Sequence, residues 1–244
     1  MRRIRVFLFS VGFALSKTAF ASTFVHSSSA AIQKTSFALA LRSEADAEKA
    51  TSRWTHAKEL LGAKYHRSVV KSGEQIADMD EVLSHWTHRA LKGRWKKFAH
   101  PVARTIIQES HKYGFDPVFL MAVIENESSF NPGVIGGAGE IGLMQVTPAT
   151  GAWITKMYNL PWKGKKSLQD PTNNIRIGAA YMAYLREEFD FEGPLYLAAY
   201  NMGSGNVRKS LGKNIFPKIY STRVMHRYLR FYAELQKKVT QANN

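Results

Sequence analysis

The sequence predicts a mainly α-helical fold. Apolar side chains recur at helical spacing along most of the chain, and no segment of useful length alternates as a half-buried strand would. Helix boundaries are also marked: Asp116 is a good N-cap, Pro117 suits the first helical position, and Gly114 ends the preceding segment. Hydrophobic residues make up 45% of the 244 positions, enough for a sizeable core. We therefore expect packed helices joined by loops.

Residues 1–21 are typical of a secretory signal peptide. They comprise the basic segment Met1–Arg5, the apolar run Val6–Leu15 and the small-residue sequence Ala19-Phe20-Ala21. The apolar run is far shorter than the roughly 20 residues that span a bilayer. We therefore expect cleavage after Ala21 and an exported protein, periplasmic or secreted, with no stable membrane insertion.

Residues 22–96 are interpreted as a linker followed by a helical N-terminal extension. Ser22–Ala40 is rich in serine and alanine with little pattern, whereas Ser43–Leu61 and Asp78–Trp95 carry apolar residues at helical spacing. These helices are too few to enclose a large core of their own. We expect them to pack on the domain that follows, which we assign to residues 97–239.

The predicted domain opens with a helix from Pro101 and continues with a buried one. Val118–Ile124 is apolar at every position, and a helix that is apolar all round is a buried helix. Glycines concentrate in Gly133–Gly142, as in a loop whose backbone approaches a ligand closely. Further helices are expected at Thr172–Phe189, Pro194–Asn201 and Thr222–Val239.

The chain is strongly basic and contains no cysteine. Its formal charge of +15 falls to +11 when the four cations of the predicted signal are removed. A basic surface attracts polyanions, which outside the cytoplasm include anionic wall polymers, lipid headgroups and DNA, and charge alone does not choose among them. The lack of cysteine excludes disulfides, thiolate metal sites and a cysteine nucleophile.

Two carboxylates at the end of the predicted buried helix are candidates for acid catalysis. Glu127 lies where burial and the negative end of the helix dipole both raise the pKa of a carboxyl group. A glutamic acid that stays protonated near neutral pH is a suitable proton donor to a glycosidic oxygen. Glu125 competes for this role. The two residues are about 200° apart around the helix, so only one faces a cleft, and local physics does not say which.

Two other patterns lack the context that their ligand sites require. Gly137–Gly142 matches the glycine pattern of dinucleotide-binding loops, but no strand precedes it and Pro148 soon interrupts any following helix. His85 and His88 share a helix face without an evident third metal ligand. We therefore expect neither a nucleotide cofactor nor a metal.

Taken together, four segments resemble, in order and spacing, the soluble-type lytic transglycosylases, which carry the SLT domain and belong to the lysozyme-like superfamily. The resemblance covers Lys97 to Val239 and leaves the N-terminal third unexplained. The segments are Glu127–Pro132, Gly142–Gln145, the stretch from Asp170 to Met182, and Ala198–Gly203.

The resemblance implies a catalytic residue and a substrate-binding set. The family's catalytic glutamate directly precedes a serine, which selects Glu127. Ser128 is expected to orient the acid, Gln145 to contact the sugar, and Tyr200 and Asn201 to line the cleft. The complete predicted substrate-binding set is Ser128, Met144, Gln145, Tyr200 and Asn201.

Two positions depart from the family pattern. Gly136 stands where many members have a serine, and Ser221 stands where many have a glutamate. Both departures concern the positioning of the substrate.

The activity that the resemblance implies is cleavage of the MurNAc–GlcNAc β-1,4 bond of peptidoglycan without water, which leaves 1,6-anhydroMurNAc ends. Glu127 would act first as acid and then as base. No metal or organic cofactor is implied, and the expected partner is the peptidoglycan glycan strand.

Three alternatives remain open at this point. A lysozyme-like muramidase would use a second acid, such as Glu140 or Asp170, to activate water. A catalytically silent module would only bind peptidoglycan in the same cleft. A basic nucleic-acid binder is disfavoured by the export signal and by the lack of a nucleic-acid motif, so no nucleic-acid partner is expected.

Overall fold

Helix α5 (Pro117–Ser128) is the most buried helix of the computed structural model, which describes residues 53–73 and 79–242. Pro117 occupies the first turn, and the Asp116 carboxylate caps the helix by accepting from the Val118 amide at 2.9 Å. Every residue from 118 to 124 is buried, which confirms the prediction from the uninterrupted apolar run. The predicted signal peptide and linker lie outside the described residues.

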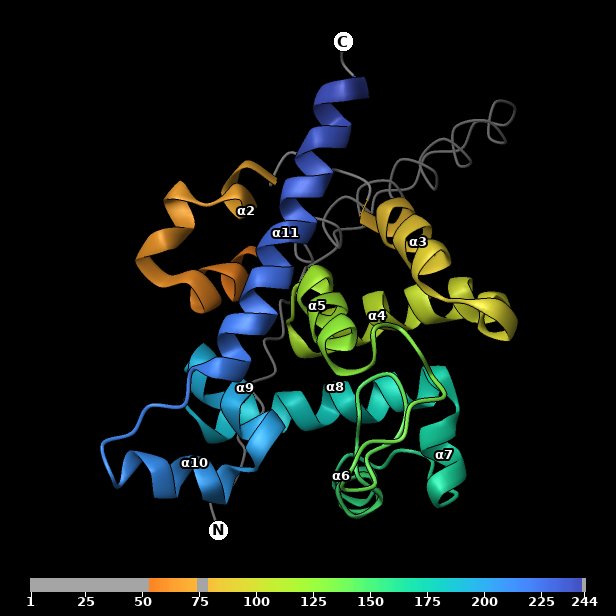
Figure 1. Ribbon diagram of the computed structural model, residues 1–244, viewed down its shortest axis with the longest axis vertical. Helices are drawn as coiled ribbons and strands as arrows, with labels where there is room; N and C mark the ends of the chain where they lie inside the picture. The colour runs from red at the N-terminus through yellow and green to blue at the C-terminus, as the bar shows by residue number, and fades with distance from the viewer. Residues whose placement is uncertain (1–52, 74–78, 243–244) are drawn as a thin grey trace, which may run out of the picture. The chain divides into compact units, whose positions relative to one another are not determined.

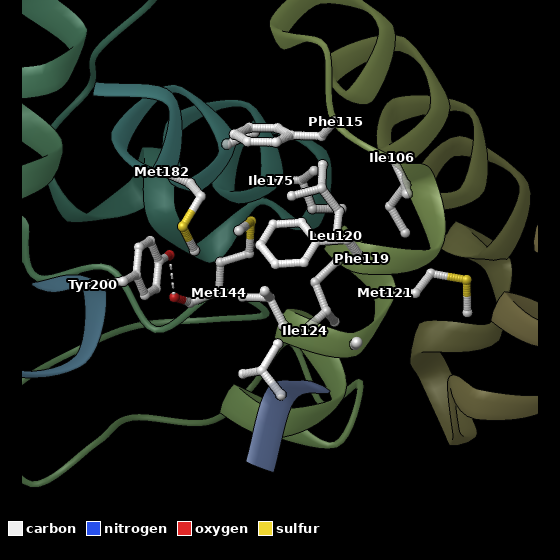
Figure 2. Close-up of a cluster of buried hydrophobic side chains, with 14 of the residues drawn as sticks. Ile106, Phe115, Phe119, Leu120, Met121, Ile124, Met144, Ile175, Met182 and Tyr200 are labelled. Atoms are coloured by element: carbon white, nitrogen blue, oxygen red, sulfur yellow. Dashed lines mark hydrogen bonds between the residues drawn. The ribbon is translucent and has the colours of Figure 1, made fainter. Parts of the chain in front are cut away.

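Four further helices were predicted in this domain and are present: α4 (Ala99–Tyr113), α8 (Pro171–Glu188), α9 (Gly193–Met202) and α11 (Ile219–Ala242). Helix α11 packs along α5, α4 packs against α8, and α9 contacts both α8 and α11 (Figure 1). Figure 2 shows apolar side chains from α4, α5 and α8 meeting in one core. The helices predicted from apolar spacing in this part of the chain are therefore present.

Three shorter helices were not predicted: α6 (Pro148–Met157), α7 (Lys165–Gln169) and α10 (Ser204–Leu211). Pro148 begins α6 instead of interrupting a helix, because a proline in the first turn lacks only an amide that has no partner inside the helix. The predicted helix at 78–95 is also shorter. It forms α3 (Met79–Ala90), and a 3-10 helix, η3 (Gly93–Phe98), follows.

Irregular backbone fills the segment between α5 and α6, which contains the glycine-rich stretch Gly133–Gly142. Within the described ranges no strand forms, and isolated bridges pair Ile141 with Ile135 and with Val146. Among the helices of residues 53–73 and 79–242, none contains an 18-residue stretch apolar enough to cross a membrane.

The described part of the N-terminal extension shares the core of the predicted domain. Residues 53–61 are helical, and η1 (Gly62–Arg67) and α2 (Val69–Ser72) follow. Helix α2 packs on α11, and α3 packs on α4 (Figure 1). The expectation that these short helices pack on the following domain is confirmed.

A buried polar network joins the extension to the start of α5. The His56 side chain is fully buried, and its Nδ1 accepts from the Asp116 amide at 3.0 Å. Its Nε2 therefore carries the proton and donates to the Tyr196 hydroxyl at 3.1 Å. Burial, and secondarily the Arg186 charge, lower the pKa of His56 well below its ordinary value, so the ring stays neutral.

The Asp116 carboxylate is the centre of this network. Beyond capping α5, its Oδ2 accepts from the hydroxyls of Tyr228 and Tyr232, both at 2.6 Å. Tyr232 in turn accepts from Arg53 at 3.1 Å. Burial raises the pKa of Asp116, and the nearby Arg53 charge and the tyrosine hydroxyls oppose that rise.

We predict that Asp116→Ala destabilises the protein by about 3–5 kcal/mol, because it removes a helix cap and leaves two buried hydroxyls without an acceptor. The matched control is Asp170→Ala. Asp170 also caps a helix, α8, but it is exposed and satisfies no buried tyrosine, so its loss should cost about 1 kcal/mol. Urea unfolding of both variants measures the difference, and similar losses would contradict the role assigned to the network.

Candidate active site

A cavity of about 350 Å³ opens beside the C-terminal end of α5. Its walls come from the end of α5, the glycine-rich loop, the start of α6, and helices α8 and α9. The lining residues are Glu127, Gly136, Gly137, Glu140, Gln145, Val146, Thr147, Thr150, Tyr181, Tyr200, Asn201 and Gly203. Four of the six residues predicted for catalysis and substrate binding therefore line one cavity.

Glu127 lies in the last turn of α5 with its carboxylate partly buried. Its Oε1 accepts a short hydrogen bond from the Tyr220 hydroxyl, which comes from the first turn of α11. Burial is the main cause that raises the pKa of Glu127 above its ordinary value, and Glu140 adds to the rise. Tyr220, Asn126 and Arg223 lower it without cancelling the effect of burial. The carboxyl group therefore holds its proton to a higher pH than an exposed glutamate.

Glu125 has a different environment. Its carboxylate forms an ion pair with Arg230 and lies 3.7 Å from the Arg227 guanidinium, both further along α11. Glu125 does not line the cavity. Of the two helix-end carboxylates, Glu127 is thus the one available to a ligand there, as expected if only one of them faces a cleft.

Three side chains fix the buried backbone of residues 141–144, which lie between the cavity-lining residues Glu140 and Gln145. Ser128 donates to the Leu143 carbonyl at 2.8 Å, and Tyr200 donates to the Met144 carbonyl at 2.8 Å (Figure 2). Asn174 from α8 accepts from the Met144 amide at 2.8 Å and donates to the Ile141 carbonyl at 2.7 Å. Three separate helices therefore hold a segment that has no secondary structure of its own.

Gln145 follows this segment in a left-handed conformation, with φ of 48°, which is uncommon for a residue other than glycine. Its Nε2 donates to the carbonyls of Gly142 at 2.9 Å and Val134 at 3.2 Å. These two bonds orient the side-chain amide, whose oxygen lies beside Gly136, another residue that lines the cavity. A strained backbone at a fixed polar side chain is typical of a binding position.

Tyr200 and Asn201 occupy the last turns of α9. The Tyr200 ring is largely buried and packs on Tyr181, with ring centroids 5.2 Å apart, whereas Asn201 is exposed. Both line the cavity beside Glu127. They form a wall with an aromatic surface and an amide at its edge.

Ser128 and Met144 lie behind the cavity wall. Ser128 is 8% exposed, and its hydroxyl contacts the carbonyls of Ile124 and Leu143 instead of the Glu127 carboxylate. The Met144 side chain is fully buried against Gly178, where an added Cβ would come within 2.6 Å of its sulfur. The geometry gives both residues a supporting role. Direct contact of their side chains with the substrate stays a prediction, and their buried positions do not support it.

The two departures from the family pattern lie in different places. Gly136 lines the cavity, and a Cβ there would overlap the Glu140 carboxylate and approach the Gln145 amide oxygen to 2.8 Å. The glycine thus leaves the space that Glu140 occupies. Ser221 is buried outside this cavity, and its hydroxyl donates to the Lys218 carbonyl at 3.0 Å.

Sequence reasoning missed Tyr220 as a member of the site. Tyr220 is buried, and it contacts Glu127 across 93 positions of sequence. The available signal was the apolar stripe of the last helix: Tyr220 precedes Val224 by four residues and so continues that stripe by one turn. Its partner, however, cannot be read from the stripe.

The two histidines considered as metal ligands lie on the surface. His85 and His88 are both exposed on α3. In the described ranges, no three histidine, aspartate or glutamate side chains gather closely enough to hold a metal ion.

Comparisons with known proteins relate the chain to one group of enzymes, the lytic transglycosylases. Residues 104–221 match the family model of the transglycosylase SLT domain. The chain is similar to the soluble lytic murein transglycosylase of Salmonella typhimurium, with 38% identity over 97 residues, 39% of this chain and 15% of that protein. It is also similar to the membrane-bound lytic murein transglycosylase C of Serratia proteamaculans, with 36% identity over 121 residues, 46% of this chain and 34% of that protein. The chain thus matches about a third or less of each relative's length.

A solved structure gives the same fold. An inactive mutant of the lytic transglycosylase Slt from Pseudomonas aeruginosa superposes with a TM-score of 0.51 at 19% sequence identity. The likeness covers 75% of this chain and 37% of that chain. The prediction of a mainly helical fold is therefore confirmed, and this fold is like that of a solved lytic transglycosylase. The roles of individual residues stay predictions.

We predict that Tyr220→Phe raises the pKa of Glu127, because it removes a hydrogen bond that favours the ionised carboxylate. The pKa is measured by NMR titration of the Glu127 side-chain carboxyl carbon. Tyr181→Phe is the matched control, since Tyr181 lines the same cavity but is not one of the groups that shift the pKa of Glu127. An unchanged pKa in Tyr220→Phe would contradict the hydrogen bond.

We also predict that Glu127→Gln stabilises the protein at neutral pH. The pKa of Glu127 is higher in the folded chain than in the unfolded chain, so its ionisation destabilises the fold as the pH rises through the folded pKa. Below the unfolded pKa the carboxyl is protonated in both states, and the advantage of glutamine disappears.

Thermal unfolding at pH 7 and at about pH 3.5 tests this dependence. The control Glu125→Gln loses its ion pair with Arg230 and should not raise the melting temperature at pH 7. A Glu127→Gln variant no more stable than wild type at pH 7 would rule out the proposed cost of burying this carboxylate.

Proposed function

We propose that this protein is a lytic transglycosylase of peptidoglycan, because residues 104–221 match the family model of the transglycosylase SLT domain. It cleaves the MurNAc–GlcNAc β-1,4 bond without water and leaves 1,6-anhydroMurNAc ends. The single observation that carries the proposal is Glu127, whose pKa is raised by burial and which faces a cavity beside Gln145, Tyr200 and Asn201.

Glu127 performs both proton transfers. As a neutral acid, it gives its proton to the glycosidic oxygen as the bond from that oxygen to MurNAc C1 breaks, and the GlcNAc hydroxyl leaves. The resulting carboxylate takes the proton of the MurNAc C6 hydroxyl, whose oxygen closes onto C1. The enzyme returns to its starting protonation state, and no water enters the product.

The ring closure explains why one carboxylate suffices. The C6 hydroxyl is part of the same sugar as C1, so the attack gains the large effective concentration of an intramolecular reaction. Tyr220 supports both forms of Glu127. Before the first proton transfer, its hydroxyl donates to Oε1 of the neutral carboxylic acid, and after the transfer it donates to the same oxygen of the carboxylate. No protein nucleophile and no cofactor is needed for this sequence of steps.

The cavity offers fixed polar groups to a sugar. The Gln145 amide oxygen is an acceptor for a hydroxyl or an acetamido N–H, held by the two bonds from Nε2. Asn201 lines the same cavity with an exposed side chain, and Tyr200 and Tyr181 present aromatic surface on which a sugar ring packs. We propose that Ser128 and Met144 act through the backbone that they support.

A muramidase is the second candidate, favoured by one observation: Glu140 lines the same cavity as Glu127. Glu140 Oε2 accepts from the Ala138 amide at 3.0 Å, which holds it on its own loop. Asp170, the other acid considered, caps α8 and does not line the cavity. The hydrolytic alternative therefore depends on Glu140 activating a water.

The proposed substrate also determines in which compartment the protein must act. Peptidoglycan lies outside the cytoplasm, so the proposed activity requires export, as the signal-like residues 1–21 predict. The soluble and membrane-bound relatives are both named for action on murein. Neither a silent peptidoglycan-binding module nor a nucleic-acid binder would need a glutamate with a raised pKa, as Glu127 has.

Mass spectrometry of digests of purified sacculi tests the reaction. We expect products that end in 1,6-anhydroMurNAc, with Glu127→Gln lowering the rate on the order of 10²–10⁴-fold because the proton donor is lost. The matched control Glu125→Gln should keep the products and most of the rate. Glu140→Gln should also keep the anhydro ends.

Each other outcome has a defined meaning. Reducing ends that disappear in Glu140→Gln would establish the muramidase instead. Full activity in Glu127→Gln would show that another group is the acid. Binding of sacculi without any release of muropeptides would leave a silent module as the function.

A further inference from the structure

The loop 212–219, which joins α10 to α11 and includes the first residue of α11, carries several exposed apolar side chains. Ile215 is 57% exposed, Phe216 48% and Ile219 79%. Among the described residues, Ile219 is the most exposed large apolar side chain. In Figure 1 the loop lies at the left edge, beside α10 and the start of α11. Exposed apolar side chains that gather in one place mark a contact surface, and the proposed reaction makes no use of these three.

Backbone hydrogen bonds hold the first part of the loop in shape. The amides of Lys213 and Ile215 both donate to the Ser210 carbonyl, at 3.0 and 2.9 Å. The Asn214 amide donates to the Leu211 carbonyl at 2.9 Å. Asn214 has φ of 58°, a left-handed conformation that asparagine adopts more readily than most residues. An ordered turn at the end of α10 therefore carries the apolar side chains into solvent instead of onto the core.

A groove of about 440 Å³ continues the apolar surface of the loop. Phe216 and Lys218 of the loop line one side of the groove, and the other sides come from the N-terminal extension, the start of α9 and α11. Its apolar walls suit a hydrocarbon chain. The large apolar residues that line it are Leu60, Pro194, Leu197, Phe216, Met225 and Leu229.

Cations surround this apolar surface. Lys213 and Lys218 flank the exposed apolar pair at 215 and 216, and the Lys218 ammonium lies 5.9 Å from the centroid of the Phe216 ring. A third lysine, Lys64, lines the groove. No aspartate or glutamate lines the groove, and none occurs in residues 193–233. Charge complementarity therefore requires a partner that is negatively charged as well as apolar.

We propose that the loop 212–219 and the groove, together called the docking surface, attach the protein to an anionic phospholipid bilayer. Ile215, Phe216 and Ile219 enter the boundary between headgroups and acyl chains, and the flanking lysines meet the lipid phosphates. The contact is peripheral and reversible, because one short loop and a few cations supply it. This inference goes beyond the proposed function and does not depend on it.

The composition of the loop favours a bilayer over a protein partner. Lysine is depleted in protein–protein interfaces, whereas here two lysines lie directly beside the exposed apolar side chains. At a bilayer surface, long lysine side chains reach the phosphates while their apolar neighbours stay in the hydrocarbon. The basic chain is attracted to any anionic surface, but charge alone does not account for three exposed apolar side chains.

The docking surface adjoins the candidate active site. Tyr220 directly follows Ile219 in the first turn of α11, and the Tyr220 hydroxyl donates to the Glu127 carboxylate. For a lytic transglycosylase, docking through this loop places the acid near the bilayer surface. Glycan strands close to the bilayer are then the ones that the docked protein reaches.

Binding is measured by co-sedimentation with vesicles of phosphatidylglycerol and phosphatidylethanolamine, and with neutral vesicles of phosphatidylcholine. The chain is used from Ser22, the exported form expected after cleavage, because the apolar run of the signal peptide would bind lipid by itself. We expect binding to the anionic vesicles at least about tenfold tighter than to the neutral ones, and weaker at high salt. No binding to the anionic vesicles would overturn the proposal.

Two double variants test the docking surface. Ile215→Ser/Ile219→Ser should weaken binding to the anionic vesicles at least about tenfold, because two apolar side chains no longer leave water. Lys213→Gln/Lys218→Gln should weaken it about 25-fold, since each cation at an anionic surface contributes about fivefold. All four positions are exposed, and unchanged melting temperatures check that the variants fold.

The matched controls remove similar side chains elsewhere. Ile135→Ser/Met157→Ser takes away two exposed apolar side chains outside the docking surface. Lys165→Gln/Lys166→Gln removes two exposed cations from α7, which lies on the other side of the molecule in Figure 1. Both should bind the anionic vesicles within about twofold of wild type, since charges far from the contact are screened. Losses as large as those of the loop variants would overturn the proposal in favour of attraction by the whole basic chain.

A fluorescent label locates the contact, because the chain contains no cysteine. Ile215→Cys and, as the control, Met157→Cys each carry one environment-sensitive NBD group. Anionic vesicles should brighten the label at 215 and shift its emission to shorter wavelength, since hydrocarbon replaces the water around it, and should leave the label at 157 unchanged. The same response at both positions, or none at 215, would overturn the proposal.

The remaining outcomes are also defined. Dimerisation that Ile215→Ser/Ile219→Ser abolishes, without vesicle binding by the wild type, would assign the loop to a contact between copies of the chain. None of these measurements needs catalysis. A protein that binds vesicles through the loop but releases no anhydro product would therefore overturn the lytic transglycosylase function alone.

Discussion

The candidate site depends on the attachment of four backbone positions, 141–144, to three helices. An irregular segment that is buried must find partners for its amides and carbonyls, and here side chains provide them. Ser128, Asn174 and Tyr200 each hold part of the segment, from α5, α8 and α9 respectively. Since Glu127 lies on the same turn of α5 as Ser128, the acid and the loop that faces it are fixed by one set of contacts.

Glu127 illustrates a conflict between stability and function. Burial raises its pKa, and the resulting cost to the folded state is offset by the core around α5, where every residue from 118 to 124 is buried. Tyr220 limits this cost by giving the carboxylate a hydrogen bond, yet burial still dominates. A buried carboxyl group with one hydrogen-bond donor beside it suits the role proposed for Glu127, first as an acid and then as a base.

Local signals predicted much of this fold and some of the site. The cap at Asp116 and the apolar run after it predict α5, because both are properties of neighbouring residues. Pro148 was misread, since a proline either starts or stops a helix and the sequence around it does not decide. Tyr220 was missed for a different reason: its contact with Glu127 joins two helices across 93 positions, and no periodicity reports which residues meet at a helix crossing.

The N-terminal extension is a structural part of the site's support. Its His56 accepts from the amide of Asp116, so the residue that caps α5 is held by a segment that precedes the matched domain. The same extension adds η3, whose Arg94 and Lys97 line a cavity of about 470 Å³ together with Val134. The Val134 carbonyl accepts from the side chain of Gln145, which lines the candidate site. Two contacts therefore link the extension to the site: His56 holds the residue that caps α5, and η3 borders the loop whose Val134 carbonyl holds Gln145.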